Sequence, residues 1–386
     1  MRLALRLARR AYGQTSPNPM VGALLVRNGR IIGRGWHHRA GEPHAEVEAI
    51  RHARFHGRDT KGATLYVTLE PCSTFGRTPP CTDAIQAAGI QRVVAAATDP
   101  NPLHAGRGFR ILRRAGIEVV HGILAEEAHR LNEAFHHWTV HRTPFVTVKT
   151  ALTLDGKIAT ASGESKWITG RNARAYAMKL RQGADAILVG INTIMADNPA
   201  LTWRSLRPPP FALPDHSRPR RVVLDTRART PLNAKIVNDR HAGLTTIVVG
   251  RSAPGKRVAA LSRRVNVWVA PTLATSGLPA APRPRAGEPP PSVQIDLRWL
   301  LHRLGAESVT SLLVEGGGEV SASFLLGGFA QRVAFFFAPK ILGGRDARKA
   351  VAGQGVRRPQ EVIQLREVTW RRLEPDLLLT ALVAAR

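Results

Sequence analysis

Three side chains that bind metals well lie far apart in this chain, and using them together strongly constrains its fold. His44 is followed by Glu46 in the segment Pro-His-Ala-Glu, and Cys72 and Cys81 enclose eight residues. One imidazole and two thiolates are good Zn²⁺ ligands, and three protein ligands leave the fourth tetrahedral position for water, as in catalytic sites. A chain that holds one metal with these residues must bring three separate segments to one point.

The surrounding sequence predicts helices and strands that can do this. Leu3 and Leu7 begin the apolar stripe of a helix, and Asn28-Gly29 predicts a hairpin turn because both residues tolerate positive φ. Helices are expected over 44–53, 81–89 and 108–115, and strands over 21–26, 31–35, 63–69, 92–97 and 118–120. His44 and Cys81 would then begin helices and Cys72 would follow a strand, which places all three at one edge of a sheet.

Each of these residues has a simpler interpretation by itself. His44 could cap a helix, and either cysteine could be a small buried apolar side chain. Together with Glu46, which is placed to move protons without binding the metal, the set matches the zinc nucleobase deaminases. The first part of the chain is therefore predicted to be a hydrolytic deaminase.

The 386 residues favour two domains, and the second is predicted to follow a linker at residues 141–144. Helices such as 171–182 should cover both faces of a mostly parallel sheet. Its strands are expected over 145–151, 184–190, 221–225, 246–250, 265–269, 311–314 and 333–338. Proline-rich stretches at 204–219 and 270–292 are expected to be surface loops. The predicted domains span residues 1–141 and 145–386.

Three segments of the second domain could bind a ligand. In Leu313–Val320 a strand runs through three glycines into a helix, so backbone N–H groups could meet a phosphate. A tight strand-to-helix turn explains these glycines equally well. Segments 159–169 and 190–199 place small hydroxyls and acids in predicted loops after strands, where open α/β sheets bind ligands.

Composition limits the partners and the compartment. Two cysteines cannot form a disulfide framework, and reduced thiols suit the cytoplasm. Arg6 interrupts the first apolar stretch, so a secretory signal is not expected, and no apolar run approaches the roughly 18 residues of a membrane span. The net charge of +28 could attract nucleic acid, but it is spread along the chain rather than gathered in one segment.

Two ordered sets of motifs resemble the bifunctional riboflavin-biosynthesis deaminase-reductases over essentially the whole chain. The deaminase motifs are Thr15–Pro19, Gly35–His37, His44–Glu46 and Tyr66–Cys81. The reductase motifs are Lys149–Gly156, Gly163–Ser165, Trp167–Thr169, Asp185–Gly190 and Val314–Gly317. Nucleic-acid and nucleoside deaminases usually have two residues between the cysteines, so the eight found here favour the riboflavin family.

The resemblance implies a cytidine-deaminase-like three-layer α/β/α domain followed by a dihydrofolate-reductase-like α/β domain. Zinc would be held by His44, Cys72 and Cys81, with Glu46 as the proton shuttle. The first domain would deaminate 2,5-diamino-6-(5-phosphoribosylamino)pyrimidin-4(3H)-one. The second would use NADPH to reduce the ribosyl side chain and give 5-amino-6-(5-phosphoribitylamino)uracil.

The resemblance also implies binding residues. In the deaminase, Asn18, His37 and Arg77 would hold the substrate, with Arg77 suited to its 5'-phosphate. The substrate residues of the reductase would be Ser165, Arg181, Leu201, Arg204 and Glu315. Those facing NADPH would be Ala151, Trp167, Thr193, Asp197, Thr226, Gly317, Gly318, Glu319, Val320, Ser321, Ala322 and Ser323. Lys149 and Asp197 are the charged residues expected to act in the hydride step.

The chain departs from the family pattern at two positions. Asn198 and Gln331 stand where the family commonly has acidic residues. An acid at position 198 therefore cannot be essential if the reductase is active, and position 331 loses any interface or packing role that needs a carboxylate.

Two other functions stay open at the level of the sequence. A nucleic-acid-editing deaminase, favoured only by the charge, would release ammonia without consuming NADPH. The other is a zinc-stabilised binding module with a nucleotide-sensing domain. It would catalyse no reaction, so Glu46→Gln would change no measured property other than stability. The expected partner is instead a small phosphorylated pyrimidine, with no nucleic acid and no membrane, and a homo-oligomer is compatible with the sequence.

Overall fold

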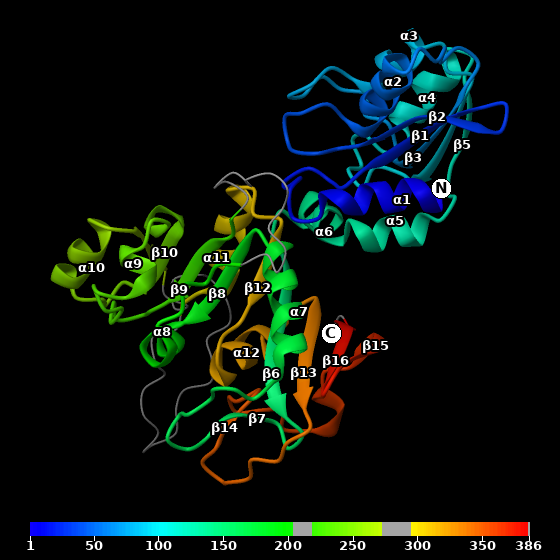
Figure 1. Ribbon diagram of the computed structural model, residues 1–386. Helices are drawn as coiled ribbons and strands as arrows, with labels where there is room; N and C mark the ends of the chain where they lie inside the picture. The colour runs from blue at the N-terminus through cyan, green and yellow to red at the C-terminus, as the bar shows by residue number, and fades with distance from the viewer. Residues whose placement is uncertain (204–217, 272–294, 385–386) are drawn as a thin grey trace. The chain divides into compact units, whose positions relative to one another are not determined.

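The computed structural model describes residues 1–203, 218–271 and 295–384 (Figure 1). The chain divides into two compact units, Met1–Thr143 and Pro144–Arg386. The expectations for Arg204 and for most of the two proline-rich stretches lie outside the described residues. Among the helices of the described ranges, none has the length and apolar character needed to cross a membrane.

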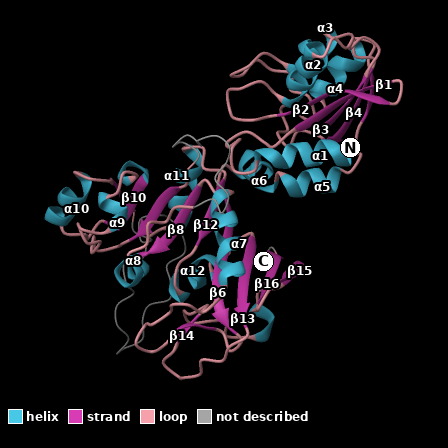
Figure 2. Ribbon diagram, viewed as in Figure 1, coloured by secondary structure: helices cyan, strands magenta, loops and turns pink. Residues whose placement is uncertain are grey.

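Unit 1 is built on a five-stranded sheet in the order β2-β1-β3-β4-β5 (Figure 2). The strands are β1 (Gly22–Arg27), β2 (Arg30–Trp36), β3 (Thr64–Leu69), β4 (Arg92–Ala97) and β5 (Glu118–Val120). The β2-β1 and β1-β3 pairs are antiparallel, whereas β3-β4 and β4-β5 are parallel. The predicted turn between β1 and β2 is confirmed, with φ of 50° at Asn28 and 71° at Gly29.

Helices cover both faces of this sheet, which gives the expected three-layer arrangement. They are α1 (Arg2–Ala8), the 3-10 turn η1 (Arg9–Ala11), α2 (Ala45–Phe55), α3 (Cys81–Ala87), α4 (Arg107–Arg114), α5 (Ala125–Leu131) and α6 (Glu133–His141). Leu24 of β1 packs against Ala4 and Leu7 of α1. Its neighbours Ala23 and Leu25 point to the opposite face, where they share a core with α2 and α3.

The sequence does not predict α5 and α6. Buried Asn132 lies between them, and its side chain accepts a hydrogen bond from the N–H of Met20 over 2.8 Å and donates to the carbonyl of Met20 over 2.9 Å. This pair of bonds ties the helices to the segment before β1. Because both helices are short, such tertiary contacts contribute more to their stability than local propensity does.

Two glycines determine how closely α2 packs against β2. A Cβ atom on Gly33 would lie 2.3 Å from the carbonyl oxygen of Ala49, and one on Gly35 would lie 2.4 Å from that of Ala45. A strand glycine at such a contact permits close backbone approach. Since His44 caps α2, these two positions also determine where the first candidate metal ligand lies.

Unit 2 contains a nine-stranded sheet in the order β11-β10-β9-β8-β12-β6-β13-β16-β15. Its strands are β6 (Phe145–Thr153), β8 (Ala186–Gly190), β9 (Arg220–Leu224), β10 (Thr245–Gly250), β11 (Asn266–Ala270), β12 (Ser311–Val314), β13 (Arg332–Ala338), β15 (Leu365–Leu373) and β16 (Asp376–Val383). The seven strands from β11 to β13 pair in parallel, as the sequence predicts. A separate small ladder joins β7 (Lys157–Ala159) to β14 (Arg348–Lys349).

The sequence does not predict the antiparallel end of this sheet, where β16 lies between β13 and β15. Gln331 immediately precedes β13, and its side-chain oxygen accepts a hydrogen bond from the N–H of Val146 over 2.7 Å. Its backbone carbonyl accepts another from the N–H of Val383 over 2.9 Å. The amide at this departure from the family pattern therefore serves the pairing of β6, β13 and β16.

Helices pack on both faces of the nine-stranded sheet, as expected. They are α7 (Arg171–Gln182), α8 (Ile191–Asp197), α9 (Lys235–Asn238), α10 (Gly255–Ser262), α11 (Leu297–Ala306) and α12 (Gly318–Leu326), with 3-10 turns η3 (Ala242–Leu244) and η5 (Pro359–Glu361). Ala173 and Ala177 of α7 pack on Phe336. Leu300 of α11 and Phe324 of α12 belong to a different core, formed on the opposite face.

The expectation that residues 190–199 form a loop is wrong, because most of this segment is helix α8. Ile191 and Ile194 are buried in the core around Ile187 and Val189 of β8. The helix ends at Asn198, whose φ of 42° is left-handed and whose side-chain oxygen accepts a hydrogen bond from the N–H of Lys235 over 2.8 Å. Asparagine tolerates this conformation well, so it suits the end of α8.

Candidate active sites

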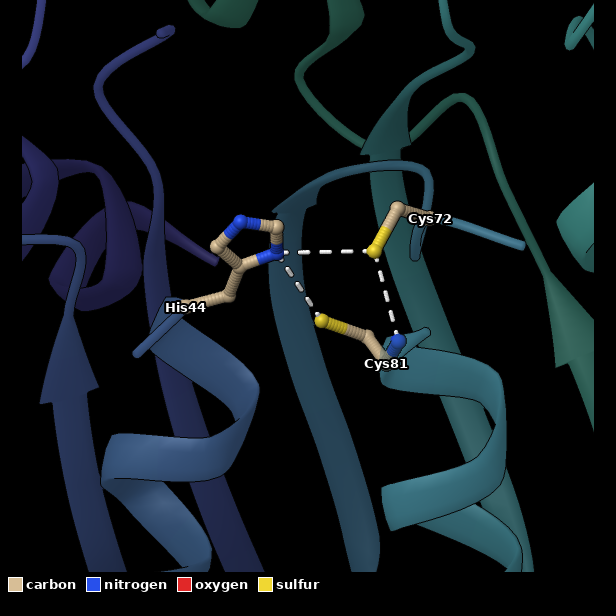
Figure 3. A group of neighbouring side chains, drawn as sticks. All are labelled: His44, Cys72 and Cys81. Atoms are coloured by element: carbon tan, nitrogen blue, oxygen red, sulfur yellow. Dashed lines mark hydrogen bonds between the residues drawn. The ribbon is translucent and has the colours of Figure 1, made fainter. Parts of the chain in front are cut away.

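The structure brings His44, Cys72 and Cys81 together in unit 1 (Figure 3). One ligand atom from each residue lies within 4.8 Å of the other two. The Nδ1 atom of His44 is 3.2 Å from Sγ of Cys81 and 3.4 Å from Sγ of Cys72. The three side chains point toward one another from three different segments of the chain, as the sequence predicts.

Local structure places each of these side chains. His44 is the N-cap of α2, Cys72 follows β3, and Cys81 is the first residue of α3. The N–H of Cys81 points to Sγ of Cys72 at 3.3 Å, so the start of α3 donates to the first thiol. A backbone donor and the positive end of a helix both favour the thiolate over the thiol.

The geometry and the charge of this group fit zinc. Zinc–nitrogen and zinc–sulfur bond lengths in a tetrahedron place the two ligand atoms about 3.6 Å apart, close to the separations found here. Hydrogen bonding from Cys81 lowers the pKa of Cys72 to about 4 and raises that of Cys81. The thiolate is therefore favoured at Cys72, and a thiolate is the form that binds a divalent cation.

Glu46 lies beside this group in the first turn of α2 and is only 3% exposed. Burial raises the pKa of its carboxyl group to about 7, and the negative charge of Cys72 adds to this effect. A carboxyl group with a pKa near neutrality can both accept and release a proton. Glu46 therefore has the position and the acidity expected of a proton shuttle.

Asn18 and His37 lie next to the candidate metal centre. The Nδ1 atom of His37 is 3.1 Å from the carbonyl oxygen of Pro43, and its Nε2 atom is 3.1 Å from the amide nitrogen of Asn18. The carbonyl can only accept, so Nδ1 carries the proton and Nε2 accepts from Asn18. Burial lowers the pKa of His37, which keeps this neutral form. The His37 ring meets the His44 ring edge-on at 5.2 Å.

The segment between the two cysteines contains one predicted residue and one that sequence reasoning missed. Arg77 is exposed. The hydroxyl of neighbouring Thr78 lies 3.3 Å from Nε2 of His44, the ring nitrogen that faces away from the sulfurs. Partners of this kind orient metal-binding histidines. The sequence feature that could have indicated Thr78 as a site residue is its position between the two candidate metal ligands Cys72 and Cys81.

In unit 2 the structure brings Arg181 and Glu315 together. The Arg181 guanidinium binds both carboxylate oxygens of Glu315 over 3.0 and 2.6 Å, and it also donates to the carbonyl of Thr202 over 2.9 Å. Burial opposes the charge of Glu315, but Arg181 and then Lys149 lower its pKa to about 2. Burial lowers the pKa of Lys149, although the negative charge of Glu315 opposes this shift. These three predicted residues form one electrostatic group.

A second group of predicted residues lies around α8 and the loop after β7. The ammonium of Lys166 is 3.6 Å from a carboxylate oxygen of Asp197. Trp167 is 65% exposed, with the Arg174 guanidinium 4.6 Å from its ring centre. The side chain of Lys340 donates to the carbonyl of Trp167 over 2.9 Å. Trp167 thus offers an aromatic face to solvent, on a loop held in place from two sides.

The glycine-rich turn runs from β12 into α12, as expected. A Cβ on Gly318 would lie 2.3 Å from the carbonyl oxygen of Lys349, whereas a Cβ on Gly317 would meet nothing. One side of the turn is therefore closed by the chain and the other is open. Within the predicted stretch, Ser321 and Ala322 are buried and Glu319 and Ser323 are exposed, so these side chains point in different directions.

The remaining predicted residues lie on several elements. Ala151 is in β6, Ser165 in the loop before α7, Thr193 in α8, Val320 in α12, and Thr226 two residues after the end of β9. Leu201 is 2% exposed and has a left-handed φ of 48°. A buried leucine with strained backbone fits a shaping role better than a polar contact.

The two units match two different family models. The model of the cytidine and deoxycytidylate deaminase zinc-binding region matches residues 1–97, and the model of the RibD C-terminal domain matches residues 144–379. With the site geometry, these matches define the chain as an enzyme that joins a zinc-dependent deaminase to a reductase. The combination is also found in similar proteins over their full length.

The riboflavin biosynthesis protein RibD of Aquifex aeolicus is 42% identical over 379 residues, which is 98% of this chain and 96% of that protein. The structure of Acinetobacter baumannii RibD has a TM-score of 0.82 and 34% identity, and it covers 99% of this chain and 97% of its own. A Thermotoga maritima diaminohydroxyphosphoribosylaminopyrimidine deaminase/5-amino-6-(5-phosphoribosylamino)uracil reductase has a TM-score of 0.77 at 33% identity, with 100% and 97% covered.

The chain belongs to the RibD family of bifunctional riboflavin-biosynthesis enzymes. It carries both parts of such an enzyme, a deaminase that uses zinc and a reductase that uses NADPH, and it acts on a small molecule. The expected fold of each part is confirmed as well.

Proposed function

We propose that residues 1–141 deaminate a phosphorylated diaminopyrimidinone and that residues 145–386 then reduce its ribosyl side chain. The grouping of His44, Cys72 and Cys81 beside buried Glu46 is the observation that carries the proposal. The substrate would be 2,5-diamino-6-(5-phosphoribosylamino)pyrimidin-4(3H)-one, and the final product 5-amino-6-(5-phosphoribitylamino)uracil.

In the deaminase, His44, Cys72 and Cys81 would hold zinc, which, when bound, would polarise a water molecule and lower its pKa. Glu46 would accept a proton from this water on its carboxylate. The deprotonated water would then form a C–O bond to the ring carbon that carries the amino group. Glu46 would give the proton to this amino group, so that the C–N bond breaks and ammonia leaves. The burial of Glu46 supports both steps, because each protonation state is accessible near neutral pH.

Asn18 and His37 would bind the pyrimidine next to the metal. Because their hydrogen bonds to each other and to Pro43 fix the His37 tautomer, the pair is orientated before the substrate arrives. Exposed Arg77 would bind the 5'-phosphate, since a guanidinium matches the geometry of a phosphate. A small phosphorylated pyrimidine uses only these groups, and so the net charge of +28 does not require nucleic acid as a substrate.

When bound to the reductase, NADPH would supply the hydride that reduces the opened, imine-like carbon of the sugar. The residues around it would position the substrate and control charge. Arg181, Glu315 and Ser165 would contact the substrate, with Leu201 shaping the pocket and Arg204 contributing from outside the described residues. Lys149 and Asp197 would act on the proton that accompanies the hydride: Lys149 is a buried ammonium that interacts with Glu315 and Arg181, and the Asp197 carboxylate lies 3.6 Å from Lys166.

NADPH itself would bind along the carboxyl edge of the sheet. Gly317 leaves backbone open to a phosphate at the start of α12, and the exposed ring of Trp167 could stack on a nucleotide. The other residues assigned to the nucleotide are Ala151, Thr193, Asp197, Thr226, Gly318, Glu319, Val320, Ser321, Ala322 and Ser323. Exposed Ser323 is less well placed, because its hydroxyl already donates to the carbonyl of Glu319. Partly buried residues of the set are better placed, among them Ala151, Thr193, Asp197 and Thr226.

We place the enzyme in the cytoplasm, where the two free thiols would stay reduced and able to bind zinc.

The test supplies the diaminopyrimidinone phosphate together with NADPH and follows ammonia release and NADPH oxidation in one reaction. With the wild-type enzyme, we expect NADPH oxidation to begin only after deamination. With a Glu46→Gln enzyme and the undeaminated compound, we expect no NADPH oxidation. Ammonia release from single-stranded nucleic acid without NADPH oxidation would contradict the proposal.

A further inference from the structure

Glu70 is a buried acid beside the candidate metal centre to which the proposed mechanism gives no role. It directly follows β3, is 5% exposed, and precedes Cys72 by two positions. Its carboxylate accepts hydrogen bonds from three backbone N–H groups, those of Asp99 and Gly106 on Oε2 over 3.1 and 2.9 Å, and that of Gly108 on Oε1 over 2.9 Å. Hydrogen bonds to an ionised acceptor are about twice as strong as neutral ones.

The three donors come from both ends of one segment, residues 99–108, which runs from the end of β4 into the first turn of α4. One carboxylate therefore ties the beginning and the end of this segment to the strand that leads to Cys72. The fit is close, because a Cβ on Gly108 would lie 2.2 Å from the carbonyl oxygen of Pro71. The segment is thus packed against the residue that immediately precedes the metal ligand.

Segment 99–108 also brings unassigned polar groups to the border of the site. Burial raises the pKa of Asp99, and the negative charges of Glu70 and Cys72 act in the same direction. Asp99 is therefore close enough to interact electrostatically with Cys72, a candidate metal ligand. The Nδ1 atom of His104 is buried and lacks a hydrogen-bond partner within the part of the chain that the structure describes. A buried polar atom without a partner is costly, which suggests that a ligand or water satisfies it.

We propose that Glu70 is a positioning residue of the deaminase, whose carboxylate holds segment 99–108 as a fixed wall of the substrate pocket. This inference rests on the proposed deaminase function. The hydrogen bonds described for the Glu70 carboxylate all come from this segment, so Glu70 acts through the segment. Substrate binding should therefore depend on it more than the chemical step does.

The test compares Glu70→Gln, Glu70→Asp and Glu118→Gln in the zinc-loaded full-length enzyme. The glutamine turns an N–H₂ group toward the backbone donors, whereas the aspartate keeps a carboxylate on a side chain one carbon shorter. Glu118→Gln is the control, because Glu118 is an exposed acid of β5 paired with Arg92. In Glu70→Gln the amides of Asp99, Gly106 and Gly108 should exchange with deuterium at least tenfold faster. KM for the diaminopyrimidinone phosphate should rise about tenfold, which corresponds to roughly 1.4 kcal/mol, with kcat changed less than about twofold.

Glu70→Asp should lie between Glu70→Gln and the wild type, and Glu118→Gln should equal the wild type. Zinc content and the NADPH-dependent reduction should be unchanged in all three. Unchanged exchange of the three amides would overturn the proposal, and so would faster exchange with unaltered KM. Loss of zinc, or faster exchange throughout unit 1, would make Glu70 a folding residue instead. If the wild type itself does not deaminate, the proposed function fails, and the exchange rates still decide whether Glu70 holds the segment.

Discussion

The two units place charged side chains after the ends of β-strands, but they balance the charge in different ways. Cys72 follows β3 in unit 1, and Glu315 follows β12 in unit 2. In unit 1 two thiols, of which Cys72 favours the thiolate, lie beside the buried carboxyl group of Glu46. In unit 2 the carboxylate is bound on both oxygens by Arg181 from the same chain.

This difference indicates what each site needs. The group in unit 1 has an excess of anionic ligands and is completed by a cation from solution. The pair in unit 2 is complete within the chain and holds its shape before any ligand binds. Metal removal should therefore affect unit 1 alone, and loss of one arginine should affect unit 2 alone.

Cys81→Ser should have the largest effect. Serine keeps the size of the side chain but removes the thiolate that zinc requires, so bound zinc should fall to a trace and deamination should disappear. Metal analysis and ammonia release measure this. Reduction of substrate that has already been deaminated should continue at the wild-type rate, and its loss would show that the units are not independent.

Glu46→Gln should separate metal binding from chemistry within unit 1. Glutamine cannot carry the proton, so kcat for deamination should fall by about 10²- to 10⁴-fold, while zinc content stays the same. Glu48→Gln is the matched control, because Glu48 lies on the same helix and pairs with Arg51 near the surface. Loss of zinc in Glu46→Gln would contradict the assigned role of Glu46.

Arg181→Met tests the internal charge balance of unit 2. The side chain of Glu315 is 8% exposed, and leaving such a carboxylate unpaired should destabilise unit 2 by about 3–5 kcal/mol. Its pKa should rise toward and beyond the ordinary value, because burial then acts without its strongest opponent. Denaturant unfolding gives the stability. Arg372→Met, at a well-exposed pair with Glu374, should cost less than about 1 kcal/mol.

Lowering the pH should destabilise unit 1 before unit 2. We expect this effect to be smaller than those of the three substitutions above. Burial, aided by His129 and His141, lowers the pKa values of His136 and His137 to about 4. Unfolded histidines bind protons near pH 6.5, so the stability of unit 1 should decrease as pH falls from about 6.5 to 4. Glu315 has a lowered pKa of about 2, so its contribution to unit 2 persists until pH falls below about 4.5.

Between pH 7 and pH 5, the melting temperature of zinc-loaded unit 1 should therefore drop by a few degrees while that of unit 2 stays constant. Circular dichroism with exchange mapping distinguishes the two transitions. Replacing both His136 and His137 by glutamine should flatten the response of unit 1. A parallel decline of both units would show that other groups control the acid sensitivity.

The sequence predicts best what side-chain chemistry dictates. A histidine, two cysteines and a glutamate have few joint uses, and their positions at helix starts and a strand end brought the three ligands together as expected. Thr78 and Glu70 were missed as site residues because their contacts depend on how the segments after β3 and β4 close over the centre. Neither a hydroxyl nor an acid in a loop indicates such a contact by itself.

Local patterns fail where tertiary packing decides. Helix α8 has only seven residues, and its helical form depends on the burial of Ile191 and Ile194 rather than on propensity. Strand β15 is exposed along nearly its whole length, so it lacks the alternation of apolar and polar residues that indicates a half-buried strand. Which predicted residues contact substrate and nucleotide stays a prediction.

The order of strands in the two sheets has a consequence for how the enzyme forms during translation. In unit 1, consecutive strands β3, β4 and β5 are neighbours, so the sheet can assemble soon after the ribosome releases its residues. In unit 2 the central strand β6 is made first, yet its partners β12 and β13 are residues 311–314 and 332–338. The deaminase can thus be folded and loaded with metal while the reductase is a nascent chain with an unpaired apolar strand, and that interval is when a chaperone would matter most.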